Sequence, residues 1–160
     1  MRPLHPVRVA RITALPDGFE ELAADALADG QRLLEVLRED WASGALRFDG
    51  PGEALFAAFA GDALLGVGGL TRDPYLKAEA AGRVRRLFVR RAARLHGAGR
   101  LLLGAISGAT GDAGWRRLRV RAPAAAFAFY ERCGFLRAVG ETAATHALPL
   151  AVSPGTPGRP

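Results

Sequence analysis

The alternation of apolar and polar residues predicts the secondary structure of the N-terminal third of the chain. Apolar and polar positions alternate over Val7–Thr13, which predicts a strand because successive side chains of a strand point to opposite faces. A helix is expected over Phe19–Ala28, with Asp17 as its N-cap. A second amphipathic helix follows from the spacing within Leu33–Leu37, and Trp41 lies near its end.

Two apolar runs in the middle of the chain predict a β-hairpin. They cover Ala54–Ala60 and Ala63–Leu70, and the turn pair Gly61-Asp62 separates them. The second run is crowded with three glycines: Gly66, Gly68 and Gly69. Glycines inside a strand indicate a bulge or a close backbone approach, so we expect one of these here.

The C-terminal half alternates between strands and helices. Thr71–Gly82 is predicted to be a polar connection, and the elements expected after it are a strand over 83–89, a helix over 99–109, a strand over 118–120, a short helix over 124–132 and a last strand over 145–150. The order β-α-α-β-β-β-α-β-α-β is that of a mixed α/β domain. We expect one domain over residues 1–152 and a disordered Pro- and Gly-rich tail over residues 153–160.

The positive charge of the chain reflects its composition more than a nucleic-acid site. The net charge is +6, but Lys77 is the only lysine among 22 basic residues, and alanine, glycine and arginine are abundant throughout. This looks like a compositional bias, so no nucleic-acid partner is expected, although a basic nucleic-acid-binding domain stays an alternative. Two arginine-dense stretches, 83–100 and 116–121, are of interest as sites for an acidic small ligand.

The composition also argues against a membrane span, a disulfide and a metal site. No apolar run approaches the roughly 18 residues of a membrane span, so no membrane partner is expected. Cys133 is the only cysteine, which excludes an intrachain disulfide and favours a cytoplasmic location. His5, His96 and His146 are isolated from one another, and no cluster has the spacing of metal ligands, so we expect no metal site.

A glycine-bearing basic loop, Arg94-Leu-His-Gly-Ala-Gly99, stands directly before the predicted helix. The first amides of a helix are unpaired and attract anions, and glycines let a phosphate approach the backbone. A dinucleotide-binding fingerprint is excluded because Leu102 replaces its third glycine, and a P-loop is excluded because Ala105-Ile106 replaces its Lys-Ser/Thr pair. An arginine-rich turn that merely caps the helix is the remaining alternative.

The loop and a second motif together resemble one family. The first is Leu87-Phe-Val89 followed by Arg94-Leu-His-Gly-Ala-Gly99, and the second is Ala126-Phe-Ala-Phe-Tyr-Glu-Arg-Cys-Gly-Phe135. Both are similar to motifs of the GCN5-related N-acetyltransferase (GNAT) superfamily, and the resemblance covers roughly residues 83–150. Pro123 departs from the pattern, because an asparagine often stands seven residues before the tyrosine.

The resemblance implies a single-domain α/β fold with a mixed, mostly antiparallel central sheet flanked by helices. Splayed strands would form a cleft for acetyl-CoA as cosubstrate, and the glycine-rich strand resembles the bulged strand that splays from its neighbour. By similarity Tyr130 is the general acid, while Phe129 and Phe135 are expected in the core. The residues implied in acetyl-CoA binding are Leu87, Phe88, Val89, Arg94, Leu95, His96, Gly97, Ala98, Gly99, Arg100 and Arg132.

The implied activity is transfer of an acetyl group to an amine of a small molecule, peptide or protein. The general base is not identified: the candidates Asp73, Glu79 and Glu131 are expected to be solvated carboxylates. His146 is expected to be structural, with the acceptor site as its alternative. Arg83, Arg85 and Arg86 suggest an anionic acceptor, which compositional bias explains equally well. A catalytically weak acyl-CoA-binding sensor is the alternative function, and a homodimer is possible.

Overall fold

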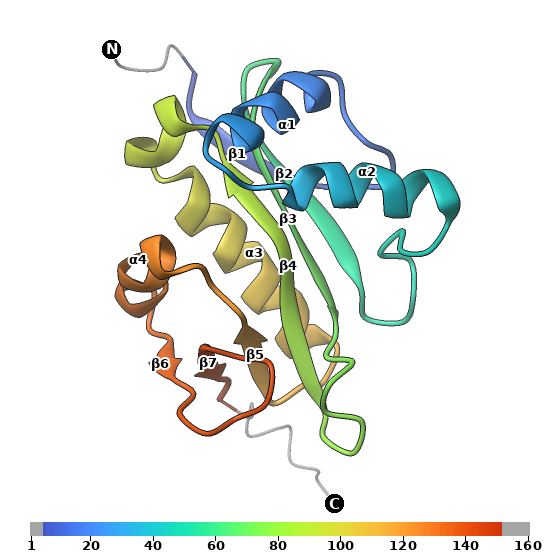
Figure 1. The fold of residues 1–160 in the computed structure, drawn as a ribbon, viewed down its shortest axis with the longest axis vertical. Coiled ribbons are helices and arrows are strands. Elements are labelled where there is room, and N and C mark those ends of the chain that lie inside the picture. The colour runs from blue at the N-terminus through green and yellow to red at the C-terminus, as the bar shows by residue number, and fades with distance from the viewer. Residues whose placement is uncertain (1–4, 152–160) are drawn as a thin grey trace, which may run out of the picture.

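One open sheet of seven strands forms the centre of the protein, shown in Figure 1 as a computed structural model that describes residues 5–151. The strands are β1 (Val7–Ile12), β2 (Ala54–Ala60), β3 (Ala63–Arg72), β4 (Ala81–Val89), β5 (Arg117–Val120), β6 (Leu136–Arg137) and β7 (His146–Pro149). The helices are α1 (Phe19–Ala28), α2 (Leu33–Ser43), α3 (Ala98–Asp112) and α4 (Phe127–Arg132), with 3-10 turns η1 (Arg91–His96) and η2 (Ala124–Ala126). The spatial order of the strands is β1-β2-β3-β4-β5-β7-β6.

The sheet is split between β4 and β5. All other neighbouring strands pair antiparallel, whereas β4 and β5 are parallel and pair only at their starts, from Ala81↔Arg117 to Arg83↔Arg119. Beyond Arg83, β4 continues to Val89 beside β3 alone. Figure 1 shows the chain after β5 turning away from β4 toward α4. Within residues 5–151, the β4 backbone past Arg83 therefore has one edge without a partner strand.

Two bulges bend the centre of the sheet. Between β2 and β3 the register shifts so that Leu65 is the extra residue, as expected for this glycine-rich strand. Between β3 and β4, Gly69 pairs with Arg85 and Val67 with Phe88, so two residues of β4 stand opposite Gly68 alone. The expectation that the glycine-rich strand itself splays was wrong, because β3 stays paired to β4 along its length and the split lies one strand further on.

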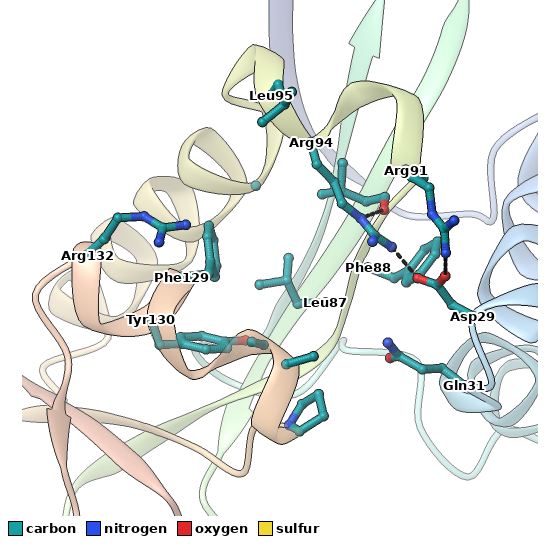
Figure 2. A pocket seen from close by; sticks show the side chains of 15 residues that line it. Asp29, Gln31, Leu87, Phe88, Arg91, Arg94, Leu95, Phe129, Tyr130 and Arg132 are labelled. Carbon is teal, nitrogen blue, oxygen red and sulfur yellow. Dashed lines mark hydrogen bonds and ion pairs between the residues drawn. The ribbon is translucent and has the colours of Figure 1, made fainter.

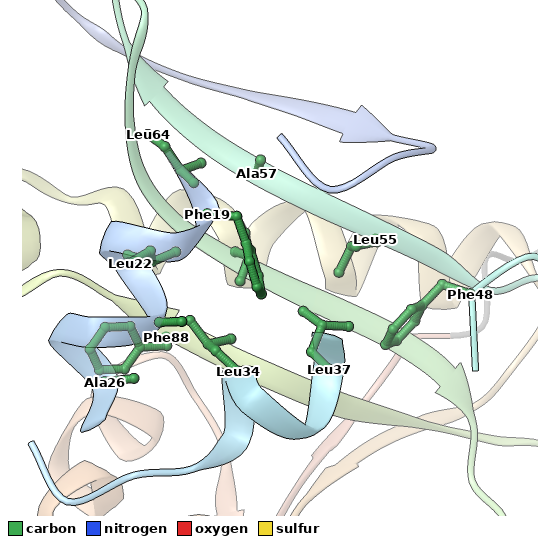
Figure 3. Packing of buried hydrophobic residues seen from close by; sticks show 12 residues of the cluster. Phe19, Leu22, Ala26, Leu34, Leu37, Phe48, Leu55, Ala57, Leu64 and Phe88 are labelled. Carbon is green, nitrogen blue, oxygen red and sulfur yellow. The ribbon is translucent and has the colours of Figure 1, made fainter. Parts of the chain in front are cut away.

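Helices cover both faces of the sheet and enclose its apolar side chains. Helices α1 and α2 pack on one face, where Phe19, Leu34 and Leu37 meet strand residues such as Leu55 (Figure 3). Helix α3 packs on the other face, where Ile106 contacts the cluster of β4 and β5. Each fully buried leucine contributes about 1.5–3 kcal/mol. The two layers thus hold β4 firmly while leaving its split edge free.

Several boundaries differ from the sequence prediction. Asp17 does not cap α1: Gly18 takes that position with φ 90°, and no side chain bonds the helix start. The predicted polar connection was too long at both ends, since β3 runs to Arg72 and β4 begins at Ala81. Thr71, Ala81 and Gly82 are buried here, and Thr71 and Gly82 each pair with a residue of the neighbouring strand across β3 and β4, which a local polarity pattern does not register. The short strand β6 and the turn η1 were not predicted.

Candidate functional site

A cleft of about 580 Å³ opens where the sheet is split (Figure 2). Its walls come from β4, the η1–α3 segment, the η2–α4 segment and the link between α1 and α2. The lining residues are Asp29, Gln31, Leu87, Phe88, Val89, Arg91, Arg94, Leu95, Gly99, Pro123, Ala125, Ala126, Phe129, Tyr130 and Arg132. The unpartnered edge of β4 therefore borders a cavity large enough for a small-molecule ligand.

The start of α3 is exposed to this cleft without a side-chain cap. Gly97 takes φ 85°, which turns the chain from η1 into the helix, and no side chain in the described part of the chain bonds the first amides of α3. Such amides have no partner within the helix and carry a partial positive charge. The predicted phosphate loop thus has the geometry of an anion site at a helix start.

Gly99 keeps the helix start close to α4. A Cβ at this position would lie 3.2 Å from Cε1 and Cζ of Phe129. That separation is tighter than ordinary van der Waals contact, so glycine lets the Phe129 ring pack against the first turn of α3. Phe129 was expected to be a core residue, but it is only partly buried and lines the cleft.

Asp29 joins the link after α1 to the basic turn η1. Its carboxylate accepts hydrogen bonds from Arg91 and, at 2.6 Å, from Nη2 of Arg94. The Arg94 Nε also donates to the Val89 carbonyl at 2.9 Å, and its guanidinium lies over the Phe88 ring. The two arginines lower the pKa of Asp29, Arg94 most strongly. No sequence motif marked Asp29, since its role depends on a contact 65 residues away in the chain.

Tyr130 is held by aromatic neighbours and points its hydroxyl into the cleft (Figure 2). Its ring makes edge contacts with Phe129 and Phe135, each at 5.2 Å between centroids, and stacks on His146 at 6.4 Å. The residue is only 4% exposed. Burial, and to a lesser degree the nearby Cys133, raises the pKa of Tyr130 strongly, so the hydroxyl is protonated at neutral pH.

The ring of His146 is buried and links β7 to α4. Its Nε2 lies 2.8 Å from a Glu131 carboxylate oxygen, and its Nδ1 lies 2.9 Å from the Thr145 hydroxyl. The hydrogen bond to His146, followed by that to Arg137, lowers the pKa of Glu131. Both nitrogens of His146 are engaged in contacts within the protein, as a structural histidine requires.

The structure brings together most of the predicted site residues. Those that line the cleft are Leu87, Phe88, Val89, Arg94, Leu95, Gly99, Tyr130 and Arg132. Four others, His96, Gly97, Ala98 and Arg100, belong to the same loop but are not part of its lining. Pro123 lines the cleft at the position where the sequence motif often has asparagine. Sequence reasoning missed Gln31, Arg91 and Ala125, which lie outside both motifs, and Ala126, which begins the second motif but was given no role.

The candidate bases lie outside the cleft lining. Asp73 was expected to be solvated, and this was wrong: its side chain is fully buried against Arg119, with 3.1 Å between Oδ2 and Nη1. Glu79 is ion-paired to Arg117 at 2.7 Å. Over residues 5–151, no cluster of His, Cys, Asp and Glu is arranged to hold a metal ion. None of the helices in that range is long and apolar enough to cross a membrane.

Comparison with known proteins finds the same fold in acetyltransferases. A "putative acetyltransferase" from Exiguobacterium sp. 255-15 has 27% identity and a TM-score of 0.79, covering 89% of this chain and 93% of its own. A GNAT-family acetyltransferase from Staphylococcus aureus Mu50 has 16% identity and a TM-score of 0.62, covering 90% and 100%. A "putative acyl-CoA N-acyltransferase" from Klebsiella pneumoniae has 19% identity and a TM-score of 0.65, covering 91% and 98%.

A family comparison reaches the same result from sequence. None of the curated protein sequences matches the chain significantly. The family model for the acetyltransferase (GNAT) domain, however, matches residues 21–150, which includes both motifs and every strand except β1. With the split sheet, the uncapped α3 start and this match in agreement, the chain belongs to the GNAT family of acetyltransferases.

Proposed function

We propose that the protein transfers an acetyl group from acetyl-CoA to an amine. The observation that carries this proposal is one cleft that combines the free edge of β4, the uncapped start of α3 and the hydroxyl of Tyr130. A phosphate-bearing, extended thioester needs these three features: an anion site, a backbone edge and a proton donor.

The residues present fit acetyl-CoA by their donor chemistry. The amides at the start of α3, with Arg94 beside them, provide a site for the pyrophosphate. The free edge of β4 over Leu87–Val89 offers peptide groups to pantetheine amides, as a neighbouring strand would. Arg132 lies at the rim beside Phe129, where its guanidinium can meet a further phosphate (Figure 2).

Tyr130 is suited to give a proton to the thiolate that leaves when acetyl-CoA supplies its thioester. The raised pKa keeps the hydroxyl protonated, and the hydroxyl faces the cleft. A free thiol has a pKa of about 8.5. A thiolate in the same buried place is disfavoured as well, because burial penalises the charged form of both groups. Because burial raises the pKa of both groups, it does not by itself drive the proton to sulfur. The protonated hydroxyl acts by donating a hydrogen bond, and then its proton, as negative charge builds up on the sulfur in the transition state.

Asp29 is not the base that deprotonates the amine. Among the described residues it is the only carboxylate that lines this cleft, but Arg94 and Arg91 hold it ionised and lower its pKa. A carboxylate with a lowered pKa has little affinity for a proton at neutral pH. The amine is thus expected to lose its proton to solvent.

Two measurements test the proposal. Calorimetric titration with acetyl-CoA reports binding, and release of free CoA thiol in the presence of a panel of primary amines reports transfer. We expect binding and amine-dependent thiol release. Absence of acetyl-CoA binding refutes the proposal, and binding without transfer to any amine favours an acyl-CoA sensor.

A further inference from the structure

Three arginines of β4 lie side by side at the point where the sheet splits. Val84 packs into the apolar cluster of α3, so its neighbours Arg83 and Arg85 point to the opposite face of the sheet, toward α1 and α2. Arg86 lies in the bulge with φ 56°. Its Nη2 reaches Asp40 of α2 at 3.4 Å, which places a third guanidinium on that same face.

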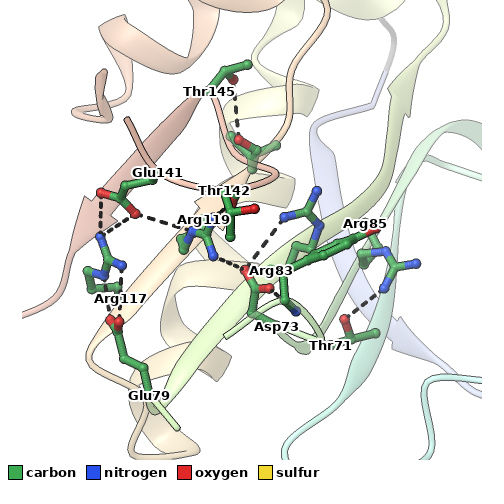
Figure 4. Close-up of polar contacts among 12 residues, drawn as sticks. Thr71, Asp73, Glu79, Arg83, Arg85, Arg117, Arg119, Glu141, Thr142 and Thr145 are labelled. Carbon is green, nitrogen blue, oxygen red and sulfur yellow. Dashed lines mark hydrogen bonds and ion pairs between the residues drawn. The ribbon is translucent and has the colours of Figure 1, made fainter. Parts of the chain in front are cut away.

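Near this part of β4 there are fewer carboxylates than guanidinium groups. Asp73 is fully buried between Arg119, at 3.1 Å, and Arg83, at 3.6 Å (Figure 4). Arg83 also stacks on the Tyr75 ring. Asp73 is thus already shared between two cations.

Arg85 is the member of this group without a counterion among the described residues. Its one side-chain hydrogen bond goes from Nη1 to the Thr71 hydroxyl at 3.2 Å, and it makes no ion pair within residues 5–151. The side chain is half-buried, and burial together with Arg86 and Arg83 lowers its pKa. A half-buried cation next to two like charges is unfavourable unless an anion joins it. This is a feature of a binding site more than of a packed core.

The position of Arg85 relates it to the proposed reaction. Arg83 is the last β4 residue paired to β5, so Arg85 lies at the start of the split, and Leu87, two residues on, lines the cleft. In the proposed reaction, a thioester whose phosphates are held at the α3 start would extend along β4 toward this point. Its acyl end would then lie near Arg85 and Arg86.

We propose that Arg85, assisted by Arg86, binds an anionic group of the acceptor, so that the substrate is an amine carrying a carboxylate or phosphate. This inference rests on the proposed acetyl transfer. Guanidinium groups bind carboxylates and phosphates alike through paired hydrogen bonds to two oxygens. The feature that the two kinds of acceptor share is therefore an oxyanion. The acceptor amine extends from that anion toward the split.

The test uses amines in matched pairs that differ only in the anion. β-Alanine is compared with β-alaninamide, and 2-aminoethyl phosphate with ethanolamine, by thiol release from acetyl-CoA. In one of the two pairs we expect the anionic amine to have a higher kcat/KM than its neutral partner. Which pair shows this difference tells whether the site binds a carboxylate or a phosphate. Arg85→Gln should raise the KM of this member about 10-fold or more, as for loss of a charge-assisted hydrogen bond, and leave its neutral partner unchanged.

Two further variants make the result specific. Arg85→Lys keeps the charge and should recover part of the affinity. Arg116→Gln removes the same charge at an exposed residue whose side chain bonds nothing in residues 5–151, and should have no effect. The inference is overturned if kcat/KM is equal within both pairs, or if Arg85→Gln lowers kcat/KM equally for neutral and anionic amines. Either result leaves the proposed acetyl transfer in place.

A binding measurement covers the case in which none of these four amines reacts. Inorganic phosphate is titrated by calorimetry into protein saturated with acetyl-CoA, so that the phosphate sites of the cosubstrate are filled. Phosphate binding that Arg85→Gln abolishes and Arg116→Gln preserves supports the anion site. Identical titrations of all three proteins overturn it. Failure of acetyl-CoA itself to bind is a different result, which refutes the proposed function.

Discussion

At the scale of single residues, the cleft depends on side chains whose surroundings change their chemistry. Tyr130 is almost completely buried yet directs its hydroxyl to the cleft, and burial keeps that hydroxyl protonated. Asp29 shows the opposite case, because two arginines keep its carboxylate ionised. One group is thereby suited to donate a proton and the other to neutralise cations.

Replacing Tyr130 by phenylalanine should lower kcat by about 100-fold, the lower range for loss of a general acid. The affinity for acetyl-CoA should be unchanged, because the ring contacts with Phe129 and Phe135 remain. Steady-state thiol release and calorimetry measure the two quantities. Tyr75→Phe, at the other tyrosine, is the matched control. Full activity of Tyr130→Phe would assign the proton to water.

Replacing Asp29 by asparagine should tighten acetyl-CoA binding severalfold at low ionic strength. The change removes a negative charge beside the proposed phosphate site and frees Arg91 and Arg94. Because the pKa of Asp29 is lowered, wild type and variant differ at neutral pH and converge only as the pH falls through that lowered pKa. Calorimetry at low and high salt measures the effect, which salt should diminish. Weaker binding would mean that positioning of η1 by Asp29 matters more than charge.

At the level of secondary-structure elements, the cleft lies between the free edge of β4 and the start of α3, which are close together but form no strand pairing. The free edge of β4 begins where its pairing with β5 stops at Arg83, and the start of α3 lies beside the end of that strand. Helix α4 closes the other wall, and the His146–Glu131 contact fixes it to β7. The close approach of α3 to α4 requires a residue without a side chain at Gly99.

Replacing Gly99 by aspartate should abolish acetyl-CoA binding. The new side chain would collide with the Phe129 ring and place a negative charge at the proposed phosphate site. Gly104→Asp is the matched control, because Gly104 is exposed on the same helix with nothing within 4 Å of its Cβ position. Calorimetry of both variants, with circular dichroism to verify folding, decides the matter. If folded Gly99→Asp protein binds normally, the phosphates lie elsewhere.

At the scale of the whole molecule, a buried ionic cluster joins the strands where the split begins (Figure 4). Asp73 follows β3 and pairs with Arg119 of β5, whose Nη2 also bonds the Thr142 carbonyl in the loop before β7. Arg117 extends the cluster to Glu79 and Glu141, and these two carboxylates raise its pKa. The cluster holds the sheet together at one end while the other end stays open.

Replacing Asp73 by alanine should destabilise the protein by about 3–5 kcal/mol, because it removes the fully buried carboxylate that lies between Arg119 and Arg83. In a chain of this size the melting temperature should fall by about 10 °C. Thermal unfolding followed by circular dichroism measures it. Asp112→Ala, at an exposed position, should change little. An unchanged melting temperature for Asp73→Ala would show that the ion pair adds no net stability.

The local parts of this protein could be predicted from its sequence. The elements around both motifs, the glycine-bearing loop before α3 and Tyr130 within α4 follow from interactions among residues a few positions apart, and the family comparison confirms the expected fold. The split between β4 and β5, the burial of Asp73 and the contact of Asp29 with Arg94 became apparent only in the folded chain. The reason is physical: these contacts join residues distant in the chain, and no local pattern of polarity encodes which of them will meet.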